Sequence, residues 1–392
     1  MKILVICQYY YPEPFRITAI CEELAGRGHE VTVVTGEPNY PEGVIYEGYE
    51  GHSRSDEILN GVTVHRCPII PRKHGTLFRM LNYFSYPYLA KKYVKKLKAS
   101  DGGDFDAVFV NQLSPVMMAE PATLYRKKHG TRVVLYCLDL WPDSLVAGGI
   151  RRDSPVFRLF RKISGRIYRS VDRILVTSRT FEDCLSDSFS IDKASISYLP
   201  QFADDLFERL PFNEPGETVN FLFAGNIGGI QSVNTVIEAA SILKDEKVRF
   251  HIVGGGTDLD RIRSLAEGID NVIVYGRRPL EEMPGFYAKA DAMLVTLKRD
   301  PFISLTLPGK VQSYMAAGKP VIGAIDGETA RVINESGCGF CGPAEDAEAL
   351  AANLMRFVKS DAKAAFCDRS RAYYDRFFSK GAFMDRLEEE LK

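Results

Sequence analysis

The chain has 392 residues, of which 45% are hydrophobic and 26% are charged, and its formal net charge is −1. This length predicts two domains, and the composition is typical of a globular protein. The balanced charge excludes a protein whose whole surface binds polyanions.

The first half of the chain alternates apolar strands with helices. Residues 2–8 predict a strand, 17–28 a helix and 30–36 a second strand, a unit that indicates a parallel, doubly wound sheet. Further strands are predicted at 62–68, 107–112, 132–140 and 173–178, and a further helix at 116–129. Because the strands are apolar throughout, both faces of the sheet must be covered. We therefore predict a Rossmann-like N-terminal domain over residues 1–200.

A second domain follows a turn-rich stretch. Residues 198–219 hold three prolines and show no periodicity, which predicts an interdomain linker. Strands are then predicted at 220–225, 248–254, 271–276, 291–297 and 321–325, and helices at 233–243, 258–267, 281–289, 328–336 and 345–358. We predict a Rossmann-like domain over 201–375 and a C-terminal helical segment, 376–392, that packs back on the N-terminal domain. The fold class is thus α/β, with two Rossmann-like domains facing a cleft.

The loops after the strands of the second domain favour an anion. In open α/β sheets, ligands bind beyond the carboxyl ends of the strands. Glycine-rich turns follow two of these strands, an arginine pair follows a third, and Lys310 stands at a helix start after a fourth. Glycines let backbone N–H groups approach an anion, and helix N-termini attract phosphate. The combination predicts a nucleotide diphosphate site, although each turn alone also fits an ordinary tight turn.

Two other nucleotide sites are not predicted. The chain has no GxxxxGK[ST] sequence, which argues against a Walker A site. The first strand leads into QYYYPEPFR and not into GxGxxG, which argues against a dehydrogenase.

Several motifs recur in order along nearly the whole chain. They are QYYYPEP (8–14), GEPNYPEG (36–43), LDLWPDS (138–144), GNIGGIQ (225–231), VGGG (253–256), LPGKVQSYMAAGKPVIG (307–323) and DGE (326–328) with the following Gly337–Cys338–Gly339. In these motifs the chain resembles the retaining glycosyltransferases of family 4, which have the GT-B fold. It is most similar to the branch of bacterial N-acetyl-L-fucosaminyltransferases and colanic-acid-type glycosyltransferases.

The resemblance implies a reaction and its substrates. A sugar, N-acetyl-L-fucosamine or a related N-acetylamino sugar, would pass from a UDP-sugar to a lipid-linked or glycan acceptor with retained configuration. The product would be a bacterial surface polysaccharide such as capsule or O-antigen. The UDP-sugar is a co-substrate, and neither a metal nor a resident cofactor is expected, because cationic side chains and backbone N–H groups can stabilise the leaving diphosphate.

The chain departs from the family at its acidic positions. Two glutamates, separated by seven residues in much of the family, correspond to Leu305 and Ser313. A histidine that commonly precedes the aspartate at the end of a first-domain strand corresponds to Leu138, which leaves Asp139. The family's catalytic glutamate therefore does not carry over. We expect Asp139 to orient the acceptor or sugar, with a structural hydrogen bond as the alternative.

The phosphate-binding positions also differ. The Arg and Lys that usually hold the donor phosphates correspond to Asn226 and Gln231. Lys310 becomes the leading phosphate ligand and, with Asp139, a catalytic candidate; a solvated lysine is the alternative. Glu328 is the remaining carboxylate for the ribose hydroxyls, unless it is an ordinary first-turn acid. The predicted donor-binding residues are Gly225, Asn226, Gly228, Gly229, Gln231, Gly254, Gly255, Arg277, Arg278, Pro308, Gly309, Lys310 and Glu328.

A basic, aromatic stretch lies in the first domain. Residues 72–98 hold eight Lys/Arg and no acid, and residues 151–173 hold eight bases against two acids. Such faces suit an anionic membrane and an acceptor carried on a polyprenyl diphosphate, although a solvated basic helix is the alternative. The predicted acceptor or membrane residues, with the lysines on one helix face, are Arg79, Lys91, Lys92, Lys95 and Lys96. Nothing resembles a nucleic-acid-binding module.

The expected location follows from the same stretch and from the start of the chain. Residue 2 opens directly into a strand, which argues against a signal peptide, and no apolar run approaches the roughly 18 residues of a membrane span. We expect a cytoplasmic protein, peripheral at the inner face of the membrane. A nucleotide-sugar epimerase of the same fold and a non-catalytic nucleotide-binding protein remain alternatives.

Overall fold

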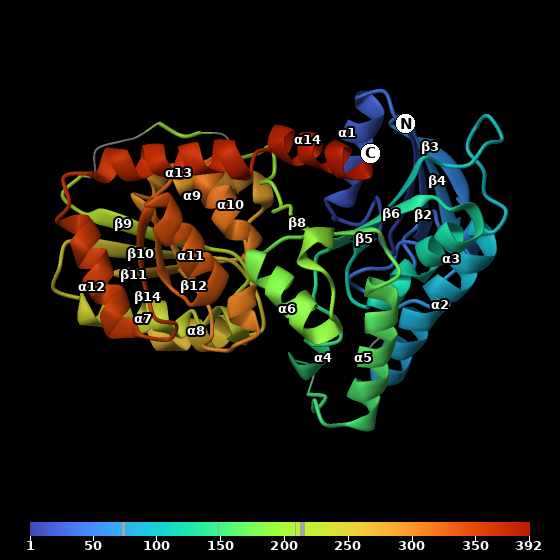
Figure 1. The fold of residues 1–392 in the computed structure, drawn as a ribbon. Helices are drawn as coiled ribbons and strands as arrows, with labels where there is room; N and C mark the ends of the chain where they lie inside the picture. The colour runs from blue at the N-terminus through green and yellow to red at the C-terminus, as the bar shows by residue number, and fades with distance from the viewer. Residues whose placement is uncertain (73–74, 148, 208, 212–215) are drawn as a thin grey trace. The chain divides into compact units, whose positions relative to one another are not determined.

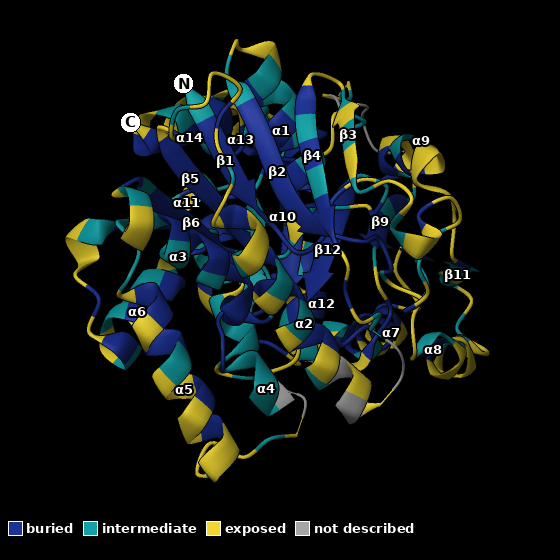
Figure 2. Ribbon diagram, turned by 90° about the vertical axis from the view of Figure 1, so that its right-hand side faces the viewer, coloured by how far each residue is buried: buried dark blue, intermediate teal, exposed yellow. Residues whose placement is uncertain are grey.

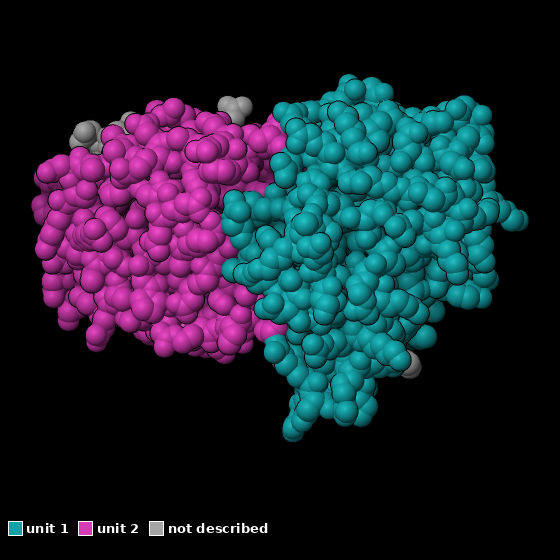
Figure 3. Space-filling view, in the orientation of Figure 1, with its two compact units in different colours: residues 1–199, 384–392 teal, residues 200–383 magenta. Residues whose placement is uncertain are grey.

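The computed structural model describes residues 1–72, 75–147, 149–207, 209–211 and 216–392. These residues form two compact units, of which unit 1 comprises residues 1–199 and 384–392, and unit 2 comprises residues 200–383 (Figure 3). The first boundary lies one residue from the predicted one.

Unit 1 is built on an eight-stranded sheet with the order β3-β4-β2-β1-β5-β6-β7-β8 (Figure 1). Its strands are β1 (Lys2–Ile6), β2 (Glu30–Gly36), β3 (Asp56–Leu59), β4 (Val62–Cys67), β5 (Ala107–Gln112), β6 (Arg132–Cys137), β7 (Arg173–Val176) and β8 (Ile196–Tyr198). Strand β3 pairs antiparallel with β4, and the other strand pairs are parallel. The order reverses between β1 and β5, so a topological switch point lies at their carboxyl ends.

Helices cover the apolar strands of unit 1, as the continuous hydrophobic runs require. They are α1 (Ile17–Gly26), α2 (Thr76–Val94), α3 (Glu120–His129), α4 (Ser144–Ala147), α5 (Pro155–Tyr168) and α6 (Arg179–Phe189). Figure 2 shows β1 and β2 buried and a row of exposed residues along α5.

Unit 2 has a six-stranded parallel sheet with the order β11-β10-β9-β12-β13-β14. Its strands are β9 (Val219–Ala224), β10 (Val248–Val253), β11 (Val272–Gly276), β12 (Ala292–Thr296), β13 (Val321–Ala324) and β14 (Gly339–Gly342). Its helices are α7 (Asn234–Ile242), α8 (Leu259–Ala266), α9 (Met283–Lys289), α10 (Gly309–Ala316), α11 (Gly327–Ser336), α12 (Ala347–Val358) and α13 (Lys363–Phe377). Alternate residues of β9 enter two core clusters, with Leu222 in one and Phe221 in the other. The switch point lies between β9 and β12.

The predicted start of the C-terminal segment, residue 376, is wrong. Helix α13 was not expected, and it belongs to unit 2 because Tyr373 and Tyr374 enter the core of that unit. The chain returns to unit 1 at Met384, within α14 (Lys380–Leu391). There Arg27 pairs with Asp385 at 2.6 Å, which holds α14 beside α1 (Figure 1).

The predicted lysine face is also wrong. Helix α2 ends at Val94, so Lys95, Lys96 and Lys98 lie beyond it. Beyond the helix, the Lys96 N–H donates to the Tyr93 carbonyl, three residues back, as in a turn, and Lys98 Nζ pairs with Asp104 at 2.6 Å.

Candidate active site

Lys310 lies at the switch point of unit 2, in the first turn of α10. Its Nζ is 3.8 Å from the centroid of the Phe223 ring on β9. The residue as a whole is partly exposed, but its Nζ is buried and has no hydrogen-bond partner among the described residues. Burial without a counter-charge lowers the pKa of this ammonium to about 7. A buried cation at a helix start, with no partner, is suited to receive an anionic ligand.

Glycines make room for this lysine. Gly225 follows β9 with φ +145°, and a Cβ there would lie 2.7 Å from Lys310 Nζ. Gly254 follows β10 with φ +153°, and a Cβ there would lie 1.8 Å from the Gly225 carbonyl oxygen. The two turns therefore pack backbone against backbone, which only glycine permits. The structure thus brings together the loops after β9 and β10 and the start of α10, as the sequence predicted.

The first donor loop is closed by neutral side chains. Asn226 Nδ2 donates to Gln231 Oε1 at 3.2 Å, and the Thr296 hydroxyl at the end of β12 donates to the Gln231 carbonyl at 2.6 Å. These amides occupy the positions at which the resemblance predicts an Arg and a Lys, and one hydrogen bond joins them. A Cβ on Gly228 would lie 3.1 Å from Asn226 Nδ2, so this glycine packs against the amide pair. A Cβ on Gly229 would meet only Asp258, at 3.8 Å. The first donor loop itself therefore supplies no cationic side chain at these two positions, and Lys310 is the buried cation beside it.

Helix α10 is fixed to β9 by a residue that the sequence did not single out. The Tyr314 hydroxyl donates to the Ala224 carbonyl at 2.8 Å and accepts from the Ala224 N–H at 3.1 Å. Ser313, which stands in place of a family glutamate, donates back to the Gly309 carbonyl at 3.3 Å. Pro308 precedes the helix as its N-cap. The signal for Tyr314 was only its place inside the recurring LPGKVQSYMAAGKP motif.

Glu328 forms an ion pair with Arg331. Its side chain is fully buried in the first turn of α11, and Arg331 donates to both carboxylate oxygens, at 2.7 and 3.2 Å. The carboxylate raises the pKa of Arg331 above its already high value. The ribose-binding role of Glu328 stays a prediction, and the geometry favours the alternative of a structural first-turn acid.

The arginine pair after β11 is exposed. The stem of Arg277 lies 3.2 Å from the place of a Cβ on Gly255, so this side chain borders the second glycine turn. Arg278 is exposed beside it. Arg277 therefore lies at the same edge as the glycine loops, and its contact with a ligand stays a prediction.

Asp139 lies beyond the end of β6 in unit 1. The Ser114 hydroxyl donates to its carboxylate in a very short hydrogen bond, and Gln112 Nε2 donates to its carbonyl at 2.9 Å. The Ser114 and Ser144 hydroxyls are 3.2 Å apart. Burial raises the pKa of Asp139 to about 6, against the opposing hydrogen bond from Ser144. Ser114 and Ser144 were missed, although Ser114 follows β5 at the switch point.

A buried carboxylate, also missed, joins two loops of unit 1. Glu13 accepts hydrogen bonds from the backbone N–H groups of Asn39 at 2.8 Å, Tyr40 at 2.7 Å and Tyr10 at 3.3 Å. Burial raises its pKa to about 7, although these three donors lower it. The loops after β1 and β2 are thereby held together at the carboxyl edge of the sheet.

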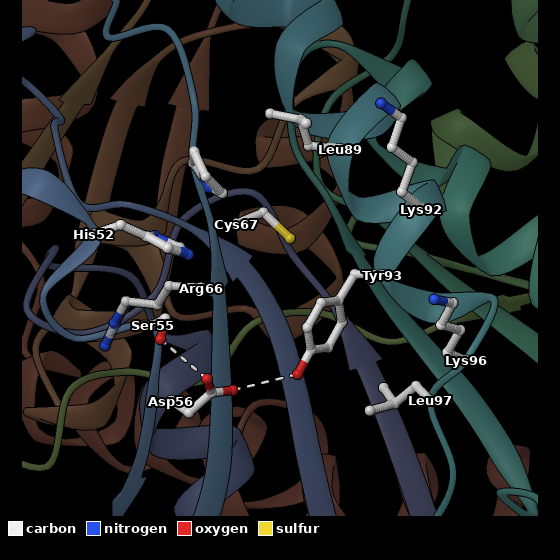
Figure 4. Close-up of a pocket in the computed structure, with 11 residues that line it drawn as sticks. His52, Ser55, Asp56, Arg66, Cys67, Leu89, Lys92, Tyr93, Lys96 and Leu97 are labelled. Carbon is white, nitrogen blue, oxygen red and sulfur yellow. Dashed lines mark hydrogen bonds between the residues drawn. The ribbon is translucent and has the colours of Figure 1, made fainter.

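The basic residues of α2 do not form one surface. Lys91 pairs with Glu120 at 2.5 Å, and Lys92 Nζ lies 4.3 Å from the centroid of the Tyr88 ring. Lys92 and Lys96 line a pocket of about 490 Å3 between β4 and α2, in which Tyr93 donates to Asp56 at 3.2 Å (Figure 4). The carbonyl of Lys95 accepts from Lys128. The side chain of Arg79 lies outside the described residues.

No metal cluster occurs in the described part of the chain, since it holds no group of three or more His, Cys, Asp or Glu in a suitable arrangement. The described cysteines are free thiols, and burial raises the pKa of Cys341 to about 12. That thiol donates to the Ile325 carbonyl at 3.2 Å.

The two Rossmann-like units have the GT-B fold of solved glycosyltransferases. A family model described as "Glycosyl transferases group 1" matches residues 218–360, and one described as "Glycosyl transferase 4-like domain" matches residues 15–201. The chain belongs to this glycosyltransferase family, which confirms the predicted resemblance. The predicted α/β fold class with two Rossmann-like domains is confirmed as well.

Individual relatives carry related names. The chain is 32% identical to the glycosyltransferase WbjE of Pseudomonas aeruginosa over 269 residues, which cover 65% of this chain and 66% of WbjE. It is 26% identical to the colanic acid biosynthesis glycosyl transferase WcaI of Escherichia coli over 388 residues, which cover 91% of this chain and 92% of WcaI. The match to WbjE therefore spans slightly less than two thirds of that relative.

Solved structures share the fold. Sucrose-phosphate synthase from Thermosynechococcus elongatus superimposes with a TM-score of 0.73 at 17% identity, covering 99% of this chain and 97% of that chain. Anabaena HepE in complex with UDP gives a TM-score of 0.71 at 14% identity, covering 100% and 99%. At these identities the likeness establishes the fold alone.

Proposed function

We propose that the protein transfers a sugar, with retained configuration, from a UDP-sugar to a polyprenyl-diphosphate-linked acceptor during bacterial surface polysaccharide synthesis. The main support for a nucleotide-sugar donor is the Lys310 ammonium at the switch point of unit 2. It is buried over the Phe223 ring and has no hydrogen-bond partner among the described residues. The UDP bound to HepE supports the class of donor, and the colanic acid biosynthesis in the name of WcaI supports the kind of pathway. The sugar we propose is N-acetyl-L-fucosamine or a related N-acetylamino sugar.

The residues divide the chemistry as follows. Negative charge develops on the leaving diphosphate, and the Lys310 ammonium with the backbone N–H groups of the glycine turns offsets it. The leaving phosphate takes the proton of the acceptor hydroxyl late in the reaction. Asp139, ionised above pH 6 or so, orients the acceptor hydroxyl or the sugar by hydrogen bonding. These steps require no resident cofactor.

A panel of UDP-sugars tests the proposal. The purified protein is incubated with each UDP-sugar and an acceptor extract, and UDP release, epimer formation and ligand binding are followed separately. UDP release with a glycosylated lipid supports the transferase. An epimer without UDP release contradicts it, and so does binding without turnover.

Replacing Asp139 with asparagine is expected to lower kcat/KM about tenfold at pH 7.5, because a charge-assisted hydrogen bond becomes a neutral one. Since burial raises the pKa of Asp139 to about 6, wild-type kcat/KM should fall as the pH drops below 6, where the carboxyl becomes protonated. The asparagine variant should lack this acidic limb. Rates measured from pH 5 to 8 check both points.

The exposed Asp153, paired with Arg151 at 2.6 Å, serves as a control, and its asparagine variant should keep the wild-type profile. If the acidic limb persists in the Asp139 variant, another group causes the limb. Glu13 is a candidate, because burial also raises the pKa of this carboxyl, to about 7.

Unit 1 also exposes apolar side chains beside its basic ones. Phe84 on α2 stacks on Phe160 of α5 with ring centroids 6.4 Å apart, so the two helices present one surface. Its exposed apolar residues are Phe78, Leu81, Phe84, Tyr88, Val156 and Leu159. Exposed Arg158 and Lys162 flank them on α5. None of the described helices is long and apolar enough to cross a bilayer. We propose that this surface rests on an anionic membrane.

Replacing both Phe84 and Leu159 with glutamate is expected to weaken binding to anionic vesicles at least tenfold, because two buried apolar contacts are lost and two charges repel the lipid. Co-sedimentation with vesicles of phosphatidylglycerol and phosphatidylethanolamine measures this. Leu280 of unit 2 is 51% exposed against 57% for Leu159, so Leu280→Glu is the matched control. Equal vesicle binding by the wild type, the double variant and Leu280→Glu would contradict the proposed surface.

A further inference from the structure

The loop after β4 is held by buried polar residues. The fully buried Asn82 of α2 donates to the Ile70 carbonyl at 2.8 Å and accepts from Gln8 Nε2 at 2.9 Å. Asn39, fully buried and fixed through its own N–H by Glu13, accepts from the Arg72 N–H at 3.0 Å. The backbone at Ile70 and Arg72 is therefore held by the loop after β2 and by α2.

The residue at the end of this chain of contacts is Arg72. Its guanidinium carbon lies 6.0 Å from the ring centroids of both Tyr40 and Tyr83, so the cation stands between two tyrosine rings. The guanidinium also lowers the burial-raised pKa of the neighbouring Tyr9 hydroxyl. No carboxylate of the described residues pairs with Arg72. One side of the guanidinium interacts with the Tyr9 hydroxyl, and its remaining N–H groups are suited to bind an anion.

Ring contacts connect this arginine with Asp139. Tyr83 meets Trp141 edge to face, with centroids 5.7 Å apart. Trp141 follows Asp139 by two residues in the loop after β6. Arg72 and Asp139 thus lie at the same carboxyl edge of the unit 1 sheet, with one tyrosine and one tryptophan between them. An anion site and a carboxylate at one edge of the sheet can serve a ligand that carries both a phosphate and a sugar.

We propose that Arg72 binds a phosphate of the polyprenyl diphosphate that carries the acceptor, and that Glu13 and Asn39 position it. This inference rests on the proposed function for the nature of the acceptor. It adds an anion site in unit 1, separate from the donor phosphate site at Lys310 in unit 2. The tyrosine rings would shield the ion pair from water, which strengthens it.

The single tryptophan of the chain reports on this site, because Trp141 touches Tyr83. The full-length protein, saturated with UDP to fill the donor site, is titrated with farnesyl diphosphate, inorganic pyrophosphate and farnesol while Trp141 fluorescence is recorded. Farnesyl diphosphate should bind saturably. Arg72→Met should weaken its binding about 10- to 100-fold, the loss expected for hydrogen bonds to a charged group. Arg72→Lys should recover part of it, since charge remains but the fork is lost.

Arg356→Met is the matched control, because Arg356 of unit 2 also stacks on an aromatic ring, at 4.2 Å from the Phe340 centroid, and its loss should leave the titration unchanged. Circular dichroism confirms that each variant is folded. Unchanged affinity in Arg72→Met, or farnesol binding as tightly as farnesyl diphosphate, would overturn the anion site. Pyrophosphate binding as tightly as farnesyl diphosphate would overturn the lipid-linked ligand. Because no UDP-sugar turnover is measured, failure here is distinct from failure of the proposed transferase.

Discussion

Replacing Lys310 with methionine is expected to lower UDP-sugar turnover about 10²–10³-fold and, at the same time, to raise the melting temperature. The activity falls because the leaving diphosphate loses its cationic partner. The stability rises because the wild-type ammonium is buried over Phe223 without a counter-charge, whereas a methionine packs there without desolvation cost. Steady-state kinetics and thermal unfolding of the same preparation measure both effects.

The stability gain should depend on pH in a defined direction. The pKa of Lys310 is about 7 in the folded chain and 10.5 in its ordinary state. Between these values the unfolded chain binds more protons, so wild-type stability should rise with pH across this window. The advantage of the methionine variant is therefore largest at pH 7 and below, and it shrinks as the pH approaches 10.5. Donor affinity should weaken above pH 7, because a bound phosphate requires the protonated lysine.

Lys298 supplies the control, since it follows β12 in the same loop region but is exposed. Lys298→Met should change neither turnover nor melting temperature by much. Near-normal activity of Lys310→Met would refute the phosphate role. A lower melting temperature would show that the cation–π contact with Phe223 outweighs the desolvation of the ammonium, which contradicts the predicted gain in stability.

The predicted fold agrees with the structure wherever burial dictates the pattern. Residues Ile3–Ile6 of β1 are buried and all apolar, so the sequence alone predicted this strand. Strand β3 was missed because its four residues, DEIL, alternate between exposed and half-buried at the sheet edge and carry two acids. Helix α13 was missed because its apolar residues are interleaved with Asp and Arg, and no N-cap side chain marks its start.

The candidate site shows a similar division. The glycine turns and Lys310 were readable because the carboxyl ends of parallel strands meet at one edge. The environment of Lys310 was not readable, because Phe223 lies 87 residues away in the sequence (310 − 223) and only the fold brings the ring to the ammonium. Glu13 was missed for the same reason, since two of its three N–H donors come from the next loop. Glu328 and Arg331 are visible as an i, i+3 pair, but the complete burial of the glutamate is a tertiary property.

Replacing Gly254 with alanine is expected to destabilise unit 2 by at least about 3 kcal/mol and to abolish donor binding. The new Cβ would lie 1.8 Å from the Gly225 carbonyl oxygen, a backbone atom that no rotamer change can move. A φ of +153° adds strain that alanine tolerates poorly. Relief requires the turn after β10 to move away from the turn after β9, and that movement opens the space in which Lys310 lies. Thermal unfolding should show a loss of about 6–12 °C, and UDP titration should show no saturation.

Gly229→Ala is the control. It tests whether any side chain added to the first donor loop destabilises the protein. A Cβ at Gly229 would meet only Asp258, at 3.8 Å, an ordinary contact, and the backbone there is not left-handed. Its stability should therefore stay within about 0.5 kcal/mol of wild type. If both alanine variants were equally stable, the close approach of the two turns would not exist in solution. If both lost donor binding but only Gly254→Ala lost stability, the backbone at Gly229 would itself contact the donor, and the phosphate cradle would extend from Lys310 along the whole first loop.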